Sequence, residues 1–311
     1  MFIKERDIPH EVIWLPRLLV RLPNHHASYE DIHLYHYQKK AGYGGEKRVD
    51  GYLKKSSDKK KLIIGDLQLG PRSCQIDTLV LTPYFILILE VKNFSGKLVF
   101  DEKSFHMKQY NRDEKLVGHN SPVTQAWHAR EEMILALEDL EISLPVFTSV
   151  VLPYSTTFVE SVPDDIPVIY AYSLNRFIST LPRTGKPLSA TELTKVGQQI
   201  LSLHTPFPRT DYLDTFNLSV SHLRKGVLCN NCGNACLKIT QRHHKCTRCE
   251  ITISNGYEDA LDDWFELVSP EITNIQCRDF LRMKDRHAAK YLLKKMALRK
   301  SGKSRGRIYM K

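Results

Sequence analysis

The chain has 311 residues, of which 42% are hydrophobic and 26% charged, and it carries a formal net charge of +10. This length and composition are typical of a soluble chain with two or three domains. No apolar run approaches the roughly 18 to 20 residues that a membrane-spanning helix needs. The N-terminus also lacks the apolar core of a secretory signal, so we expect a cytoplasmic protein.

The first part of the chain carries weak patterns. Apolar residues support a packed N-terminal arm over residues 1–37 and no more. The spacing of apolar residues predicts a helix over residues 31–55, interrupted by the flexible segment 41–45, after which Glu46 begins the regular part. An acidic residue near a helix start is also favoured by the helix dipole, so Glu46 has a purely structural interpretation as well.

Residues 62–69, 76–81 and 85–91 are predicted strands. The last two are runs of β-branched, aromatic and aliphatic residues, and Pro83 between them forbids a continuous strand or helix. We therefore expect a tight hairpin. With the preceding helix, the predicted order of elements is α-β-β-β.

This hairpin brings two acidic residues together. With a two-residue loop at 83–84, the register places Asp77 directly opposite Glu90, where Cβ atoms are about 4.5 to 5.5 Å apart. Lys92 projects to the same face by the strand period. Two carboxylates this close repel each other unless a cation or proton lies between them, and their oxygens suit Mg²⁺ or Mn²⁺. Lys92 can then orient a water or neutralise charge during phosphodiester hydrolysis, although a surface cluster on an edge strand is the alternative interpretation.

Three segments carry a family resemblance. Asp77, the run Glu-Val-Lys-Asn-Phe-Ser-Gly from Glu90, and the upstream Gly-Gly-Glu-Lys-Arg-Val resemble the nuclease-related domain, a branch of the PD-(D/E)xK nuclease superfamily. The resemblance covers residues 38–155 and implies an α/β fold, a restriction-endonuclease-like mixed sheet flanked by helices. In that superfamily the Asp and Glu bind the divalent metal, the Lys assists the water and a Glu on a helix joins the site. These roles would fall to Asp77, Glu90, Lys92 and Glu46.

Residues 120–125, Asn-Ser-Pro-Val-Thr-Gln, resemble the family's Asn-Pro-x-x-Gln segment. The proline follows Ser121 rather than the asparagine, so the correspondence is closer for Gln125 than for Asn120. Gln125 opens a predicted helix that ends at residue 140. The other predicted elements of this region are a strand at 97–100, a polar hairpin at 103–115, strands at 147–152 and 168–172, and helices at 174–181 and 190–203.

Four of the seven cysteines have the spacing of a zinc ribbon. Each Cys-x2-Cys turn places two thiolates on one side of a tight knuckle, and two such turns complete a tetrahedral, structural Zn²⁺ site. The predicted ligands are Cys229, Cys232, Cys246 and Cys249. Three further candidates lie inside the ribbon, and we expect them not to be ligands because four thiolates already complete the set. They are Cys236, His243 and His244.

The excess positive charge lies at the C-terminus, where residues 278–311 contain 13 Lys+Arg against 2 Asp+Glu. Predicted helices at 273–281 and 285–296, capped by Thr273 and Asp285, precede a basic hairpin and resemble a winged helix-turn-helix. Dense positive charge on such a pattern is typical of binding to a phosphate backbone, although a disordered basic tail is the alternative. The predicted DNA contacts are Arg286, Lys290, Lys294, Lys295, Arg299, Lys303, Arg305 and Arg307.

These features predict five segments: an arm (1–37), a nuclease-related core (38–155), an α/β extension and linker (156–225), a zinc ribbon (226–256) and a basic winged-helix-like domain (257–311). Two functions compete. The first is a metal-dependent nuclease that hydrolyses DNA, and the second is a non-catalytic DNA-binding regulatory protein built on a nuclease-like scaffold. The complete set of three acids and a lysine favours the first. RNA is the alternative nucleic-acid partner.

Overall fold

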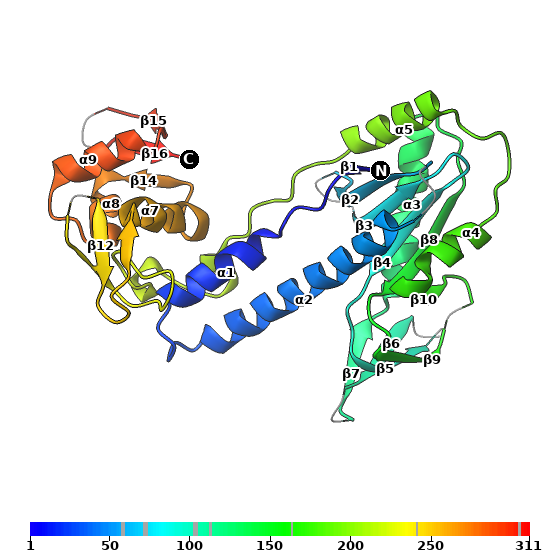
Figure 1. The fold of residues 1–311 in the computed structure, drawn as a ribbon, viewed down its shortest axis with the longest axis horizontal. Helices are drawn as coiled ribbons and strands as arrows, with labels where there is room; N and C mark the ends of the chain where they lie inside the picture. Colours follow the sequence, from blue (N-terminus) through cyan, green and yellow to red (C-terminus); the bar gives the residue numbers. More distant parts are fainter. Residues whose placement is uncertain are drawn as a thin grey trace. The chain divides into compact units, whose positions relative to one another are not determined.

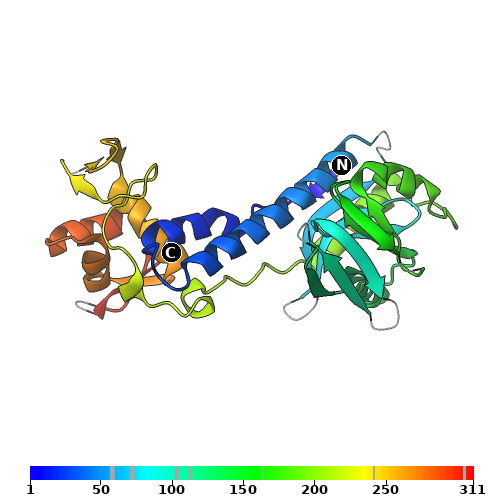
Figure 2. The same ribbon diagram turned by 90° about the horizontal axis from the view of Figure 1, so that it is seen from below.

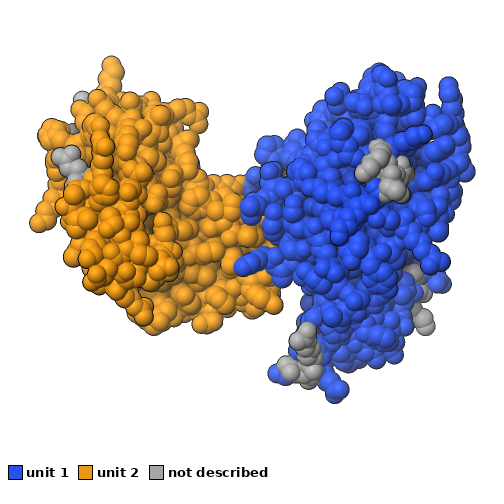
Figure 3. All heavy atoms as spheres, viewed as in Figure 1, with its two compact units in different colours: residues 1–8, 40–208 blue, residues 9–39, 209–311 orange. Residues whose placement is uncertain are grey.

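The computed structural model describes residues 1–56, 60–70, 74–101, 105–111, 114–162, 164–240, 242–303 and 306–311. They form two compact units, each assembled from two stretches of chain (Figure 3). Unit 1 comprises Met1–Ile8 and Lys40–Pro208, and unit 2 comprises Pro9–Lys39 and Arg209–Lys311. Among the helices of these residues, none combines the length and apolar character needed to cross a membrane.

A six-stranded mixed sheet forms the centre of unit 1 (Figure 1). In spatial order its strands are β1 (Phe2–Lys4), β2 (Leu62–Gln68), β3 (Gln75–Leu81), β4 (Ile86–Val91), β8 (Val146–Leu152) and β10 (Val168–Tyr170). The strands β2, β3 and β4 form an antiparallel meander, whereas β1 pairs with β2, β8 with β4 and β10 with β8 in parallel. The central sheet of unit 1 is therefore mixed, as predicted.

Helices cover both faces of this sheet. They are α2 (Tyr29–Lys54), α3 (Pro122–Asp139), α4 (Leu174–Thr180) and α5 (Ala190–Ser202), with a 3₁₀ turn η1 (Ala171–Ser173) before α4. Met133 of α3 and Ile200 of α5 belong to the apolar core on one face. Val49 of α2 and Ile178 of α4 belong to the core on the other. Burial on both faces explains why the central strands are almost continuously apolar.

A second, four-stranded sheet of unit 1 is distinct from the main sheet in both ribbon views (Figures 1 and 2). In spatial order its strands are β7 (Leu116–Asn120), β6 (His106–Tyr110), β5 (Gly96–Asp101) and β9 (Thr157–Ser161). The strands β5, β6 and β7 are antiparallel, and β9 runs parallel to β5. Gly96 has φ of +80°, and a Cβ at this position would collide with the carbonyl oxygen of Tyr110. Only glycine fits there.

Unit 2 has its own apolar core. Its helical elements are α1 (His10–Arg21), α6 (Tyr212–Thr215), η2 (Val220–His222), α7 (Gly256–Leu267), α8 (Asn274–Leu281) and α9 (Arg286–Lys295). Leu15 and Leu18 of α1 belong to the same core cluster as Phe265 of α7, Phe280 of α8 and Leu293 of α9. Helix α1 therefore packs in a core with residues of α7, α8 and α9, which lie more than 200 residues further along the chain.

Two three-stranded antiparallel sheets complete unit 2. The first has the order β11 (Cys236–Lys238), β12 (His243–Cys246), β13 (Thr252–Ser254), and the second has the order β14 (Glu271–Thr273), β16 (Ile308–Met310), β15 (Arg299–Ser301). The two expected N-caps are confirmed. Thr273 accepts a hydrogen bond from the N–H of Gln276, and Asp285 accepts hydrogen bonds from the N–H groups of His287 and Ala288.

The N-terminal region departs from the prediction. The arm at 1–37 is divided, because its first residues form β1 in unit 1 whereas α1 packs in unit 2. The expectation that Glu46 lies near a helix start is wrong, since α2 runs unbroken through residues 41–45. A Cβ on Gly45 would come within 3.0 Å of Pro153. Glycine there permits close packing of the helix rather than a flexible break.

Some elements carry no pattern that predicted them. They include β1, β9, α7 and β14. The predicted hairpin at 103–115 contains β6, whose partner strand β7 begins one residue beyond it at Leu116. Residues 103–104 and 112–113 of that prediction lie outside the described residues. The five-segment division remains a prediction. The two compact units divide the chain at other positions, because residues of the predicted zinc ribbon (226–256) and of the predicted winged-helix-like domain (257–311) pack in one core with α1.

A buried ion pair joins α1 to α7. Asp263 of α7 accepts hydrogen bonds from Arg17 Nε at 2.8 Å and Arg17 Nη2 at 2.7 Å, and from Arg21 Nε at 2.6 Å. The side chains of Asp263 and Arg21 are 1% and 0% exposed. Arg21 also donates to the carbonyl groups of Arg224 and Gly226. One carboxylate therefore pairs with two guanidinium groups from the start of the chain.

We expect Asp263→Asn to lower the free energy of unfolding of unit 2 by about 3–5 kcal/mol, because Arg21 stays buried without its counter-charge. Urea denaturation followed by circular dichroism measures this loss. The matched control is Asp262→Asn on the same helix, which breaks an exposed ion pair with Lys311 and should cost less than about 1 kcal/mol. Equal losses in the two variants would contradict the assignment.

Candidate functional site

Strands β3 and β4 hold two carboxylates side by side. Thr78 pairs with Leu89, which confirms the predicted register of the hairpin. The next position of this register places Asp77 opposite Glu90. Val91 N donates to Asp77 Oδ2 at 2.8 Å, so the aspartate side chain bonds the facing strand itself. Asp77 is 8% exposed and Glu90 5% exposed. Both acids are buried polar groups in an apolar sheet.

Lys92 lies beside this pair. Its Nζ is 2.7 Å from Glu90 Oε1, and its side chain remains partly exposed. Burial lowers the pKa of Lys92, but Glu90 and Asp77 outweigh burial and raise the pKa above its ordinary value. The ammonium group is therefore held in its charged form next to the carboxylates.

Glu46 reaches the same cluster from the interior of α2. Its Oε2 accepts a hydrogen bond of 2.9 Å from Nη1 of Arg6, which lies just after β1. The same Nη1 lies 2.5 Å from Asp66 Oδ1 on β2. Helix α2, strand β2 and the segment after β1 thus meet at one guanidinium group.

All five N–H groups of Arg6 have acceptors, and its side chain is fully buried. The acceptors are Asp50 Oδ2 for Nε, Glu46 Oε2 and Asp66 Oδ1 for Nη1, and the Asp77 carbonyl oxygen and Thr78 Oγ1 for Nη2. A guanidinium group has five donors in a fixed fork, so its orientation is fully determined. No sequence pattern indicated this role, because Arg6 stands alone in a segment without periodicity.

Asp66 is the second residue that the sequence analysis missed. It has φ of +50°, which is unusual for a residue other than glycine. It also interrupts the β2–β3 pairing between Gly65↔Thr78 and Leu67↔Ile76. Residues other than glycine with a positive φ gather at active sites. An acidic residue inside an apolar strand was a signal that could have identified it.

Burial raises the pKa of these acids. Desolvation, reinforced by the charge of Asp77, raises the pKa of Glu90 to about 8. The same two causes raise the pKa of Glu46 to about 7. Desolvation also raises the pKa of Asp77. Without a further cation the cluster therefore retains protons near neutral pH, and a divalent cation can replace them.

The donor set fits a hard divalent cation such as Mg²⁺ or Mn²⁺, which prefers carboxylate oxygens. Asp77 and Glu90 are the residues that would hold it. Among the described residues, the four cysteines form a group of potential ligand atoms that all lie within 4.8 Å of one another. The carboxylates of Glu46, Asp77 and Glu90 do not form such a group. A metal held by two carboxylates would complete its coordination with water, as Mg²⁺ commonly does.

Gln125 and Asn120 lie outside this network. Ser121 caps α3, and Gln125 is exposed one turn into that helix, with its N–H bonded to the Ser121 carbonyl. Asn120 is exposed at the end of β7. Within the described part of the chain, neither side chain forms a hydrogen bond with the carboxylate pair.

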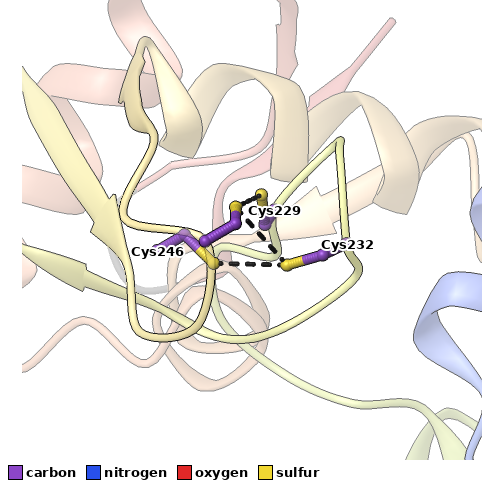
Figure 4. Close-up of side chains that lie close together, drawn as sticks. Cys229, Cys232 and Cys246 are labelled. Carbon is purple, nitrogen blue, oxygen red and sulfur yellow. Dashed lines mark hydrogen bonds between the residues drawn. The ribbon is translucent and has the colours of Figure 1, made fainter.

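The four predicted zinc ligands come together in unit 2 (Figure 4). Their sulfur atoms all lie within 4.8 Å of one another, with Sγ···Sγ distances of 3.5 Å for Cys229 and Cys249 and 3.4 Å for Cys232 and Cys246. Gly233 has φ of +69°, and its N–H bonds the Cys229 carbonyl, which closes the first knuckle. This group can hold a zinc ion.

The backbone around the second Cys-x2-Cys turn favours thiolates, whereas burial and the neighbouring sulfur atoms raise the pKa of Cys232 to about 11. Hydrogen bonds from the N–H groups of Cys249 and Arg248 lower the pKa of Cys246 to about 6. The N–H of Ile251 lowers the pKa of Cys249. Thiolates are the metal-binding form. The three spare candidates are not part of the four-ligand group: Cys236, His243 and His244.

Helix α9 presents a basic face. Ala289, Leu292 and Leu293 are buried, whereas the other side of the helix is exposed. The exposed residues on it are Arg286, His287, Lys290, Tyr291, Lys294 and Lys295. Lys295 differs from the rest, because its Nζ pairs with Glu258 of α7 at 2.5 Å. Of the remaining predicted contacts, Arg299 and Lys303 are exposed and Arg307 is half-buried, whereas Arg305 lies outside the described residues.

Comparison with known families identifies the class of the first unit. Residues 41–153 match the family model of the nuclease-related domain, close to the limits predicted from the sequence. The chain therefore contains a nuclease-related domain, and the mixed sheet flanked by helices fits a nuclease-like fold. The matched range includes Glu46, Asp77, Glu90 and Lys92 but excludes Arg6. No curated protein and no solved structure matches the chain.

For the zinc group, we expect about one zinc ion per chain after purification, because four clustered thiolates bind it tightly. Cys229→Ser should lose this ion and loosen the ribbon. Cys236→Ser is the matched control, since this thiol lies in the same ribbon outside the four-ligand group, and it should retain the ion. Metal analysis by mass spectrometry measures both. A zinc content near zero in the unaltered chain would contradict the assignment.

Proposed function

We propose that the protein is a metal-dependent nuclease that hydrolyses phosphodiester bonds of DNA. The observation that carries the proposal is the buried cross-strand pair of Asp77 and Glu90 with Lys92 Nζ 2.7 Å from Glu90. The match of this segment to the nuclease-related domain supports it. A divalent cation at the pair would polarise the scissile phosphate and lower the pKa of a bound water.

The protein side chains would divide the remaining work. Asp77 and Glu90 bind the cation, and Asp77 is held in place by the N–H of Val91. Lys92 is partly exposed and charged, so its ammonium group can stabilise negative charge that develops on the phosphate or orient the attacking water. Glu46 would act on the cation from a greater distance, through a water molecule. Gln125 would lie at the rim of the substrate groove.

A winged helix-turn-helix in unit 2 would bind the DNA. The order α7-β14-α8-α9-β15-β16 and the sheet order β14-β16-β15 support this assignment, since α8 and α9 form the helix pair and β15 with β16 forms the wing. In such modules the second helix enters the major groove. Helix α9 has an exposed face of Arg286, Lys290 and Lys294 over an apolar side. The proposed domains are those predicted from the sequence, with the zinc ribbon (226–256) before this module (257–311).

A non-catalytic DNA-binding regulatory protein is the second candidate. One observation favours it: the acids are already partly compensated by Arg6 and Lys92. A scaffold that had lost its metal would need such internal cations. The pKa values of Glu46 and Glu90, raised by burial and by the charge of Asp77, argue for catalysis, because strongly shifted carboxylates gather at functional sites.

We expect Asp77→Asn to abolish both Mn²⁺ binding at this site and cleavage, and Lys92→Ala to retain Mn²⁺ and lower the cleavage rate about 10²–10³-fold. Calorimetric Mn²⁺ titration and cleavage assays on single-stranded, duplex and branched DNA measure both. Lys97→Ala is the control, because this exposed lysine pairs with Glu160 on the second sheet. Cleavage that is unchanged in Asp77→Asn, or absent in the unaltered chain with Mg²⁺ and Mn²⁺, would favour the regulatory protein.

For DNA binding, we expect a variant with alanine at Arg286, Lys290 and Lys294 to have a smaller slope of log K against the logarithm of the salt concentration. The slope should fall by about 2.7, because each lost phosphate contact contributes roughly 0.9. Fluorescence anisotropy with duplex DNA measures the slope. Lys295→Ala is the matched control on the same helix, because Lys295 already pairs with Glu258, and it should change the slope by less than about 1. Parallel titrations with RNA identify the preferred nucleic acid, and an unchanged slope in the triple variant would contradict the proposed interface.

A further inference from the structure

Arg6 is a permanent positive charge inside the carboxylate cluster. Its side chain is fully buried, and its five donors all have acceptors within the cluster or on β3. A buried guanidinium group is costly unless its charge and donors are matched. Arg6 lies outside the matched nuclease-related segment, so the residues at 41–153 do not supply this cation themselves.

The charges of the cluster fit one divalent cation. Five carboxylates interact electrostatically here: Glu46, Asp50, Asp66, Asp77 and Glu90. Three cations act on them: Arg6, Lys92 and Lys4. The difference is two negative charges, which one divalent cation neutralises. A second divalent cation would leave an excess of two positive charges in a buried site, which is unfavourable.

The contacts of Arg6 resemble those of a bridging cation. A single nitrogen, Nη1, lies 2.9 Å from Glu46 Oε2 and 2.5 Å from Asp66 Oδ1, so it joins an acid of α2 to an acid of β2. Its Nη2 holds the backbone carbonyl of Asp77 at 2.6 Å, on the residue that would bind the metal. In two-metal nuclease sites, a second divalent ion joins carboxylates in this way.

We infer that Arg6 is a positioning residue that takes the place of a second divalent cation, so that this site binds one metal ion. The inference rests on the proposed function and deepens it. Arg6 uses Glu46 Oε2 and leaves Oε1 without a hydrogen bond from the described residues. Glu46 can thus act on a metal-bound water while its position is fixed from the opposite oxygen.

The experiment counts ions on the full chain with its zinc group loaded. Calorimetric titration and electron paramagnetic resonance with Mn²⁺ alone should give one ion in the unaltered chain, lost in Asp77→Asn. Arg6→Gln removes the charge but keeps an amide donor, and it should bind a second Mn²⁺ with spin coupling between the ions. Arg6→Lys keeps the charge and should stay at one. Arg17→Gln, in the other unit, is the matched control for loss of a carboxylate-bound arginine and should also stay at one.

The outcomes separate this inference from the proposed function. No Mn²⁺ in the unaltered chain means that the proposed function fails. Two ions in the unaltered chain overturn the role of Arg6 and leave the nuclease proposal intact. A folded Arg6→Gln protein that binds one Mn²⁺ ion or none also overturns the role of Arg6. Removal of an arginine with a purely structural role would lower the stability without raising the number of bound ions. If neither Arg6 variant folds, the count in the unaltered chain decides.

Discussion

The register of the hairpin β3–β4 is the constraint on which the site depends. Thr82 determines it: its N–H donates to the Phe85 carbonyl, and its Oγ1 accepts from the N–H groups of Tyr84 and Phe85. These bonds close a short loop and fix which residues face each other. A slip of one residue would turn the acid of either strand to the opposite face of the sheet and separate Asp77 from Glu90. The turn is therefore a remote determinant of the chemistry at the far end of the two strands.

Around this hairpin, the further members of the cluster come from several elements. Glu46 comes from α2, Asp66 from an irregular position in β2, and Arg6 from the segment after β1. A site assembled in this way depends on the packing of the whole sheet. In unit 2 the buried carboxylate of Asp263 has a similar role, because it gathers two arginines of α1 onto α7. Both units thus use one buried, fully bonded charged group to attach a segment from the start of the chain.

Much of this was predictable from local patterns. The hairpin register followed from a proline and two apolar runs, the zinc ligands from their spacing, and the caps Thr273 and Asp285 from their position before apolar helices. These features depend on neighbours within a few residues. Arg6 and β1 were not predictable, because their partners lie some 60 residues away in β2 and only the folded sheet brings them together. The break predicted before Glu46 was wrong because three glycines suggested flexibility, whereas one of them serves close packing against Pro153.

The interleaving of the two units has a consequence for synthesis of the chain. Unit 1 is complete once Pro208 has been made, and its N-terminal strand needs only β2 to pair. Helix α1 is different, because its partners Trp264, Phe280 and Leu293 follow it by more than 200 residues. At ribosomal rates of roughly 5–20 residues per second, Leu15 and Leu18 remain without their core for at least about ten seconds. An emerging chain thus exposes an apolar helix next to a domain that has already folded, which makes α1 a natural binding segment for chaperones during translation.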